Sequence, residues 1–226
     1  ARHLDTAGFE SLRVPNGTQG LARLRFERPD VCVVDLMLPG TDGWSLIDTG
    51  LGDKATERAW TELLAGPLSA RPLNRIIVTH FHPDHVGAAG WLLKRFDVPL
   101  YMSATEYLLS LNMHLDPGAL EADHYRRFYR NHGLDDATTQ NVVTKGHEYL
   151  RIVSGLPKTY RRLLAGDVLR IGGREFEVLT GGGHSPEQVM LLCRSDKILL
   201  AADQVLAKSS PNVSVAAVDP AGDPLG

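Results

Sequence analysis

Histidine and aspartate side chains are concentrated in one segment, residues 79–87, which reads THFHPDHVG. Three of the nine histidines lie here, His80, His82 and His85, together with Asp84. Imidazole nitrogens and carboxylate oxygens are the side-chain donors that bind zinc in many proteins. The apolar run before the segment predicts a buried strand, and the residues after it predict a helix. This composition at a strand-to-helix turn predicts a metal-binding segment.

The spacing of these side chains predicts two neighbouring metal positions. Residues two apart in an extended chain project to the same side, so His80 and His82 can bind one ion. Asp84 and His85 follow where the chain turns into the helix, so they point to a neighbouring position. Two zinc ions about 3.5–4 Å apart polarise an ester or phosphoryl oxygen and supply hydroxide near neutral pH. A structural zinc site and a solvent-exposed histidine loop are the alternative interpretations.

The rest of the chain predicts the elements that must position these side chains. Between residues 44 and 102, the sequence predicts strands at 44–48 and 75–79 and helices at 54–66 and 86–96. From Ser103 to about Leu164 the pattern is helical. Consecutive strands are then predicted at 167–173, 174–180, 188–193 and 197–203. This order predicts a layered α/β protein with a helical insertion, residues 103–164, in its middle.

Composition and charge narrow the class of protein. The chain has 226 residues, a formal net charge of -3 and 43% hydrophobic residues, which is typical of a globular protein with one large or two small domains. No apolar run approaches about 18 residues and no secretory leader is recognisable, so we expect no membrane span. Cys32 and Cys193 lie in strand-like apolar runs, which indicates buried thiols and favours a cytoplasmic protein. The balanced charge makes nucleic acid an unlikely partner.

Four segments, in the expected order, resemble motifs of the metallo-β-lactamase fold. They are LIDTG at 46–50, HFHPDH at 80–85, TGGGHSPEQ at 180–188 and LLAADQ at 199–204. The resemblance extends from Asp42 to Gly226. It implies a four-layer αββα sandwich with two divalent metal ions at one edge of the paired sheets. Zinc is the expected metal, with manganese or iron as alternatives.

The resemblance also implies a role for each site residue. Asp48 would buttress the metal-binding segment. The implied ligand sets are His80, His82 and His184 for the first ion, and Asp84, His85 and Asp203 for the second, with Asp203 shared. A metal-bound hydroxide would then attack the substrate, with Asp84 as the catalytic residue that orients it.

Both ends of the chain depart from the resemblance. Family members carry a further strand, helix and histidine ligand after the position of Asp203, and no histidine follows Asp203 here. We therefore expect a sandwich that is incomplete at its C-terminus and a second metal position that is one ligand short. At the other end, residues 1–43 predict a βαβ fragment in place of the first hairpin.

The segment 1–43 resembles part of a response-regulator receiver domain. Its DLMLPGTDGW run places Asp35 at the phosphoacceptor position. The acidic pair, the later Thr or Ser and the Lys of a receiver are absent from residues 1–43, with an upstream segment as the alternative source of the acidic pair, and we interpret the segment as a structural graft. The expected organisation is a receiver-like fragment at 1–43 and a metallo-β-lactamase-like domain at 44–226.

A metal-dependent hydrolase is the function that these observations predict. Basic residues of the helical insertion favour an anionic ester such as a phosphodiester, with a thioester or lactone as the alternative. They are Arg126, Arg127, Arg130, Lys158, Arg161 and Arg162. A hypothesis of another class is a signalling or interaction module that retains an inert remnant of the fold. We also expect a homodimer that covers the sheet edge left by the missing C-terminal elements.

Overall fold

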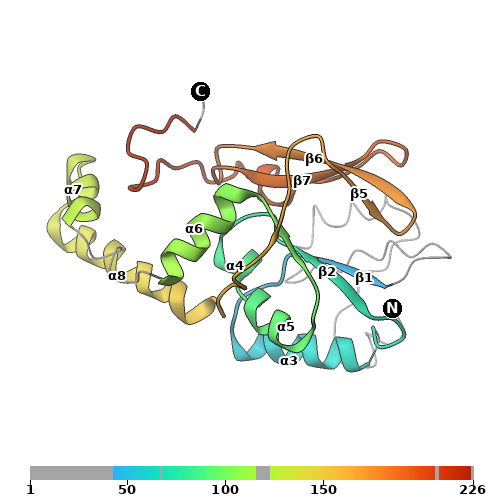
Figure 1. Ribbon diagram of the computed structural model, residues 1–226. Coiled ribbons are helices and arrows are strands. Elements are labelled where there is room, and N and C mark those ends of the chain that lie inside the picture. Colours follow the sequence, from blue (N-terminus) through green and yellow to red (C-terminus); the bar gives the residue numbers. More distant parts are fainter. Residues whose placement is uncertain (1–42, 67, 116–122, 207–208, 225–226) are drawn as a thin grey trace.

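The computed structural model describes residues 43–66, 68–115, 123–206 and 209–224 (Figure 1). The elements predicted within residues 1–42, and with them Cys32 and Asp35, lie outside the described residues. The receiver-like fragment and the two domain boundaries therefore stay predictions.

Two four-stranded sheets form the centre of the fold. The first is parallel, with strand order β1 (Trp44–Ile47), β2 (Leu73–Ile77), β3 (Leu100–Met102) and β4 (Arg161–Arg162). The second is antiparallel, with strand order β5 (Val168–Ile171), β6 (Arg174–Gly181), β7 (Gln188–Cys193) and β8 (Ile198–Leu200). The strands β1 and β2 and the consecutive strands after the insertion agree with the sequence prediction, whereas β3 was not predicted.

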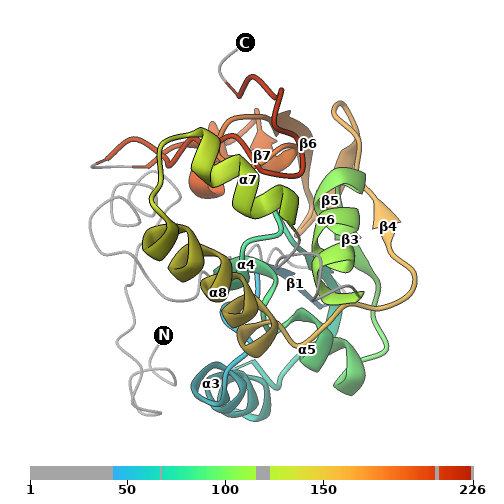
Figure 2. The same ribbon diagram turned by 90° about the vertical axis from the view of Figure 1, so that its left-hand side faces the viewer.

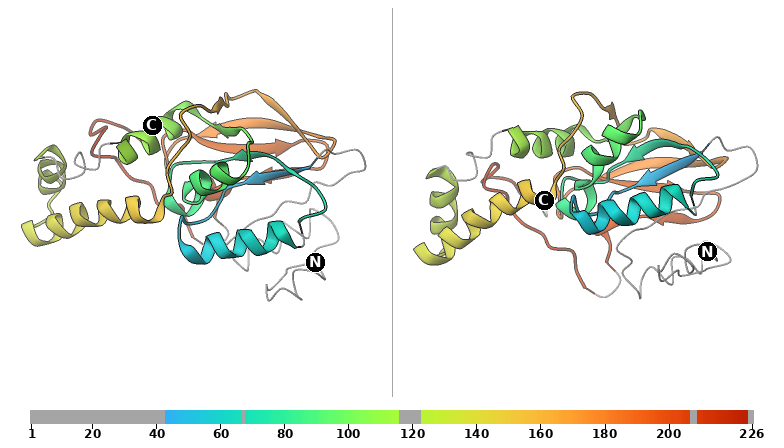
Figure 3. Two further views of the ribbon diagram at one scale, coloured as in Figure 1. Left: turned by 60° about the horizontal axis from the view of Figure 1, so that its bottom comes forward. Right: turned by 90° about the horizontal axis from the view of Figure 1, so that it is seen from below.

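Two apolar clusters hold the layers together, one on each face of the first sheet. Side chains alternate between the faces of a strand. Ile76 of β2 therefore packs with Trp60 of α3 (Lys54–Ala65) and with α5 (Ala89–Arg95), whereas Ile77 packs with Phe176 of the second sheet. The continuous apolar run of β2 follows from this burial on both faces. Figure 3 shows α3 lying across the first sheet, with the second sheet on the other side.

The described residues form three of the four predicted layers: helices, first sheet and second sheet. On the outer face of the second sheet, Val168 is 55% exposed, and the described helices leave this face open (Figure 1). The α/β sandwich is thus confirmed, with the second helical layer not formed by described residues. The predicted homodimer concerns contacts with a second chain and stays a prediction. None of the described helices combines the length and apolar character needed to cross a bilayer.

The helical insertion is shorter than predicted. It contains α6 (Ala104–Leu115), α7 (Asp123–Asn131) and α8 (Asp136–Ile152), and α7 and α8 project from the body (Figures 1 and 2). The prediction of a helical pattern up to Leu164 was wrong for its last part. Gly155 has a φ of 92°, which a right-handed helix does not allow. The chain beyond it returns to the first sheet as β4, where backbone pairing with β3 replaces helical hydrogen bonds.

Candidate metal centre

The histidine segment lies at the carboxyl end of β2 and leads into the short helix α4 (Pro83–Val86). The carbonyl of Thr79 accepts a hydrogen bond from the backbone N–H of Val189 at 2.9 Å, which ties the segment to the second sheet. His82 is the extended residue before the helix, and Pro83 begins it, as its fixed φ favours. The structure therefore places the segment at the edge where the two sheets meet.

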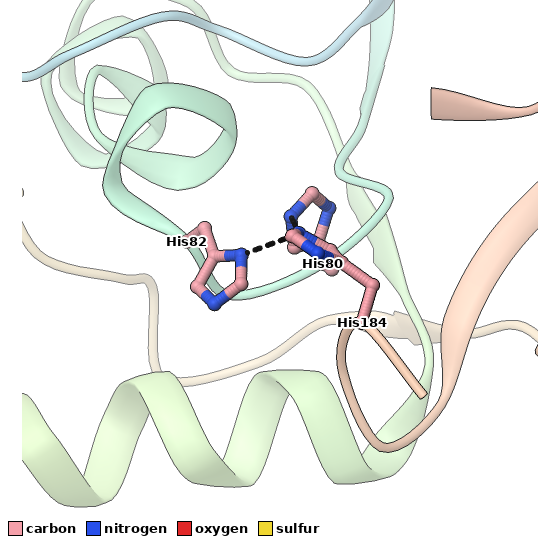
Figure 4. A group of neighbouring side chains, drawn as sticks. All are labelled: His80, His82 and His184. Atoms are coloured by element: carbon pink, nitrogen blue, oxygen red, sulfur yellow. Dashed lines mark hydrogen bonds between the residues drawn. The ribbon is translucent and has the colours of Figure 1, made fainter. Parts of the chain in front are cut away.

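Three histidine rings converge at this edge (Figure 4). Nε2 of His184, in the loop between β6 and β7, lies 3.2 Å from Nε2 of His80 and 2.9 Å from Nδ1 of His82. Three nitrogens bound tetrahedrally to zinc at about 2.0–2.1 Å would lie roughly 3.4 Å from one another. The residues predicted to bind the first ion are thus brought together at a spacing that suits one small cation.

A second group of donors adjoins the first. Nε2 of His85 lies 3.6 Å from a carboxylate oxygen of Asp203 and 3.6 Å from one of Asp84. Asp203 belongs to the short 3-10 helix η2 (Ala202–Gln204), and the same oxygen lies 3.5 Å from Nε2 of His184. Asp203 therefore lies between the two groups, where a ligand shared by two ions would lie. Asp84 is less enclosed, since its side chain is 64% exposed.

Hydrogen bonds to the other ring nitrogen orient three of the histidines. Nδ1 of His80 lies 3.0 Å from Oγ1 of Thr79, and Nδ1 of His184 lies 3.0 Å from the backbone carbonyl of Asn212. Nδ1 of His85 lies 2.8 Å from Asp48. In each case Nε2 is the nitrogen left to face the site, which is the usual way in which outer partners orient metal ligands.

Asp48 holds the metal-binding segment as the sequence predicts. Its carboxylate accepts hydrogen bonds from the backbone N–H of Thr79 at 2.8 Å and from the Thr79 hydroxyl at 2.9 Å. The residue has a φ of 58°, a conformation that aspartate and asparagine tolerate better than most residues do. Asp48 therefore fixes both the strand end and the ring of His85.

The histidines of the site differ in their affinity for protons. Burial, reinforced by the surrounding histidines, holds the pKa of His80 far below its usual range. Burial and the neighbouring His184 lower the pKa of His82 to about 4. Burial also opposes protonation of His85, but Asp48, Asp203 and Asp84 together outweigh it and raise its pKa to about 10. His80 and His82 are thus neutral near pH 7, the form in which imidazole binds a metal, whereas His85 would have to release a proton in order to bind one.

Sequence reasoning missed two side chains that contact the metal-binding segment from the helical insertion. Glu106 of α6 accepts a hydrogen bond from the backbone N–H of Phe81, and the hydroxyl of Tyr149 of α8 donates one to its carbonyl. The sequence offered no usable signal, because the full burial of Glu106 in α6 is seen only in the structure. Its partners are backbone groups, and these carry no residue-type signal in the sequence.

Comparisons with known proteins agree with this fold. A family model described as the metallo-beta-lactamase superfamily matches residues 28–225. The structure is similar to that of a beta-lactamase domain protein from Burkholderia ambifaria, with 35% sequence identity and a TM-score of 0.68, over 83% of this chain and 53% of that one. The chain spans about half the length of the relatives with which it shares its longer alignments.

Two curated proteins match shorter parts of the chain. Exodeoxyribonuclease YycJ of Bacillus anthracis is 35% identical over 68 residues, which are 30% of this chain and 25% of that protein. Transcriptional regulatory protein CseB of Streptomyces coelicolor is 46% identical over 43 residues, which are 19% of this chain and 18% of that protein. With the family match over most of its length and the histidine and aspartate cluster at the sheet edge, the chain belongs to the metallo-beta-lactamase superfamily.

Proposed function

We propose that the protein is a binuclear metal-dependent hydrolase. Members of its superfamily are usually metal-dependent hydrolases, and the His and Asp cluster suits divalent cations. The observation that carries the proposal is the position of His184, whose Nε2 lies 3.2 Å from His80 on one side and 3.5 Å from Asp203 on the other. Two sets of donors therefore share one small space, which suits two neighbouring ions better than one structural ion.

The proposed ligands follow the two groups of clustered donors, His80, His82 and His184 and then His80, His85 and Asp203, except that Asp84 is outside the second group and is added because its carboxylate lies 3.6 Å from His85. They are His80, His82 and His184 for the first ion, and Asp84, His85 and Asp203 for the second, with Asp203 shared. The donors combine imidazole nitrogen and carboxylate oxygen, a set that suits zinc and also iron or manganese. Ions held in this way would supply a water activated near neutral pH and positive charge for the substrate oxygen.

Asp84 is the proposed catalytic residue. Its carboxylate lies 3.6 Å from Nε2 of His85 and its side chain is 64% exposed, so water or substrate can reach it. From there the carboxylate can orient a water by accepting its hydrogen bond and can take up its proton. No serine or cysteine nucleophile is then required.

For the substrate, we propose an anionic ester of the phosphodiester class. The support is the partial similarity to a protein named as an exodeoxyribonuclease. The basic residues of the insertion give less support than the sequence suggested. Arg130 forms an ion pair with Asp136 at 2.6 Å, and Arg126 donates to Gln140, so both link α7 to α8. A thioester or lactone therefore remains the alternative substrate.

A metal analysis combined with a substrate panel tests the proposal. The purified protein should contain close to two divalent ions per chain. It should hydrolyse bis-p-nitrophenyl phosphate faster than a phosphomonoester, thioester, lactone or β-lactam, and a chelator should abolish this activity. Asp203→Asn should lose both metal and turnover, whereas His132→Ala should keep both, because His132 is exposed and bonded to the carbonyl of Phe128. A metal-free protein without turnover would instead support an interaction module.

A further inference from the structure

The peptide groups around Phe81, the residue between His80 and His82, are held by side chains from the helical insertion. The backbone N–H of Phe81 donates to Oε2 of Glu106 at 3.0 Å. Its carbonyl accepts a hydrogen bond from the hydroxyl of Tyr149 at 2.9 Å. Figures 1 and 2 show α6 and α8, which carry these two side chains, beside α4. The backbone between the two histidines is thus bonded on both its donor and its acceptor side.

Glu106 also reaches the loop that carries His184. Its other oxygen, Oε1, accepts a hydrogen bond from the backbone N–H of Glu187 at 2.7 Å. The start of α6 strengthens this connection, because Ser103 donates to the carbonyl of Glu187 at 2.9 Å and the backbone N–H of Thr105 donates to its carboxylate at 3.0 Å. One carboxylate therefore joins two segments that are far apart in the sequence and that together carry His80, His82 and His184.

The burial of Glu106 indicates that its hydrogen bonds, and not packing alone, explain why a carboxylate occupies this position. The side chain is 0% exposed, and burying a carboxylate is unfavourable unless hydrogen bonds compensate. Burial raises its pKa, while the N–H groups of Glu187 and Phe81 oppose that rise. An apolar residue would fill the position at lower cost, but it could not accept two N–H groups from two separate loops.

We propose that Glu106 and Tyr149 are positioning residues of the metal centre, which set the distance between the His80–His82 segment and the His184 loop. The inference rests on the proposed function, since it concerns the same site. Donor atoms of a metal site must be held within a few tenths of an ångström of their required positions. The helical insertion would thereby influence the first ion without coordinating it. Its two side chains hold the backbone of the segments on which the histidine ligands lie.

Metal affinity in graded variants tests the inference. Glu106→Gln keeps one carbonyl oxygen, so it can accept from only one of the two loops, and Tyr149→Phe removes only the hydroxyl. Each should weaken binding of the more tightly held zinc ion by about tenfold or more, as outer partners of metal ligands do. Affinity is measured by competition with a chromophoric chelator. The visible spectrum of the cobalt-substituted protein should change as well, because it reports the geometry of the ligands.

The matched control is Tyr107→Phe. Tyr107 lies next to Glu106 in α6, and its hydroxyl donates to the carbonyl of Pro157 at 2.7 Å, outside the metal-binding loops. This control should keep the wild-type affinity within twofold. If Glu106→Gln does not fold, Tyr149→Phe alone decides the outcome. Wild-type affinity and spectrum in Tyr149→Phe, and in any folded Glu106→Gln, would overturn the inference. Failure of the wild type to bind zinc would instead overturn the proposed function.

Discussion

Asp48 and His85 are 37 residues apart in the chain, and a carboxylate oxygen of Asp48 lies 2.8 Å from Nδ1 of His85. The same oxygen accepts a hydrogen bond from the hydroxyl of Thr79. The residue that follows β1 thus fixes the ring of a proposed ligand in α4, the short helix after β2. The parallel pairing of β1 with β2 brings the two residues together, so the metal centre depends on the register of the first sheet.

Asp48→Asn should weaken binding of the second ion by about 10–100-fold, because the neutral amide cannot accept from both Thr79 and His85 as the carboxylate does. Asparagine tolerates the positive φ of this position, so the fold should be retained. Titration of the folded, metal-free variant with zinc measures the affinity for the second ion. Asp53→Asn is the control, since Asp53 caps α3 and asparagine is an equally good cap. Equal zinc affinity in the two variants would contradict the role assigned to Asp48.

His82→Ala should remove one ion and the hydrolytic activity together. The Nδ1 atom of His82 lies 2.9 Å from His184, and its loss leaves the first position with two histidines and the shared Asp203. Metal content per chain and turnover are measured on the same preparation. Near-normal turnover with one ion fewer would show that the first position is not required for the reaction.

Acid should destabilise the metal-free protein between about pH 6.5 and pH 4. The pKa of His82 is about 4 in the fold and about 6.5 in the unfolded chain, so the unfolded state binds more protons in this window. The free energy of unfolding therefore falls as the pH falls. Urea unfolding in the presence of a chelator, at several pH values, measures this slope. His82→Asn should reduce this slope without abolishing it, because the lowered pKa of His80 contributes to the same slope. An unchanged slope in that variant would contradict the assignment.

Alkali should destabilise the metal-free protein through His85. Its pKa is raised to about 10 in the fold, so the stability that it contributes is fully present below about pH 6.5 and is lost as the pH rises through 10. The free energy of unfolding of the chelator-treated protein should therefore decline from pH 7 to pH 10. In Asp48→Asn this decline should be smaller, because the carboxylate that stabilises the charged ring is gone.

Gly87→Ala should destabilise the fold by about 1–3 kcal/mol through overpacking. A Cβ at Gly87 would lie 2.3 Å from the carbonyl oxygen of Pro83, 2.5 Å from the nitrogen of Gly52 and 2.6 Å from the carbonyl oxygen of Ile152. Thermal unfolding measures the change. Gly182→Ala is the comparison, because a Cβ there would make only one ordinary contact, at 3.8 Å, and it should unfold near the wild-type temperature.

Asp35→Asn should leave hydrolysis and stability nearly unchanged. The segment 1–43 lacks the acidic pair and the lysine that a receiver domain uses to bind magnesium and stabilise phosphoaspartate. Turnover of the variant and labelling of the wild type with acetyl phosphate check this expectation. Stoichiometric labelling at Asp35 would show that the segment is a working receiver.

The sequence by itself determined the chemistry of the site and most of the elements around it. Residue types and short spacings are local properties, so the THFHPDHVG segment predicted both the donors and the strand-to-helix turn on which they lie. The apolar run of β2 likewise predicted a buried strand, and the structure shows that its side chains alternate between two apolar clusters. The prediction of the helical insertion was wrong after Ile152, because β4 is a two-residue edge strand whose pairing is not local.

The tertiary structure decided which distant groups meet, apart from the ligand sets that the family resemblance already implied. His184 reaches His82 across 102 residues because the second sheet packs against the first and turns its β6–β7 loop toward the end of β2. Glu106 and Tyr149 gave no usable signal, since the groups they bind are backbone atoms of other segments. Arg130, one of the six basic residues that together favoured an anionic substrate, forms an ion pair with Asp136. Spacing along the chain predicts neighbours within one element, whereas packing of the sheets and helices selects the partners between elements.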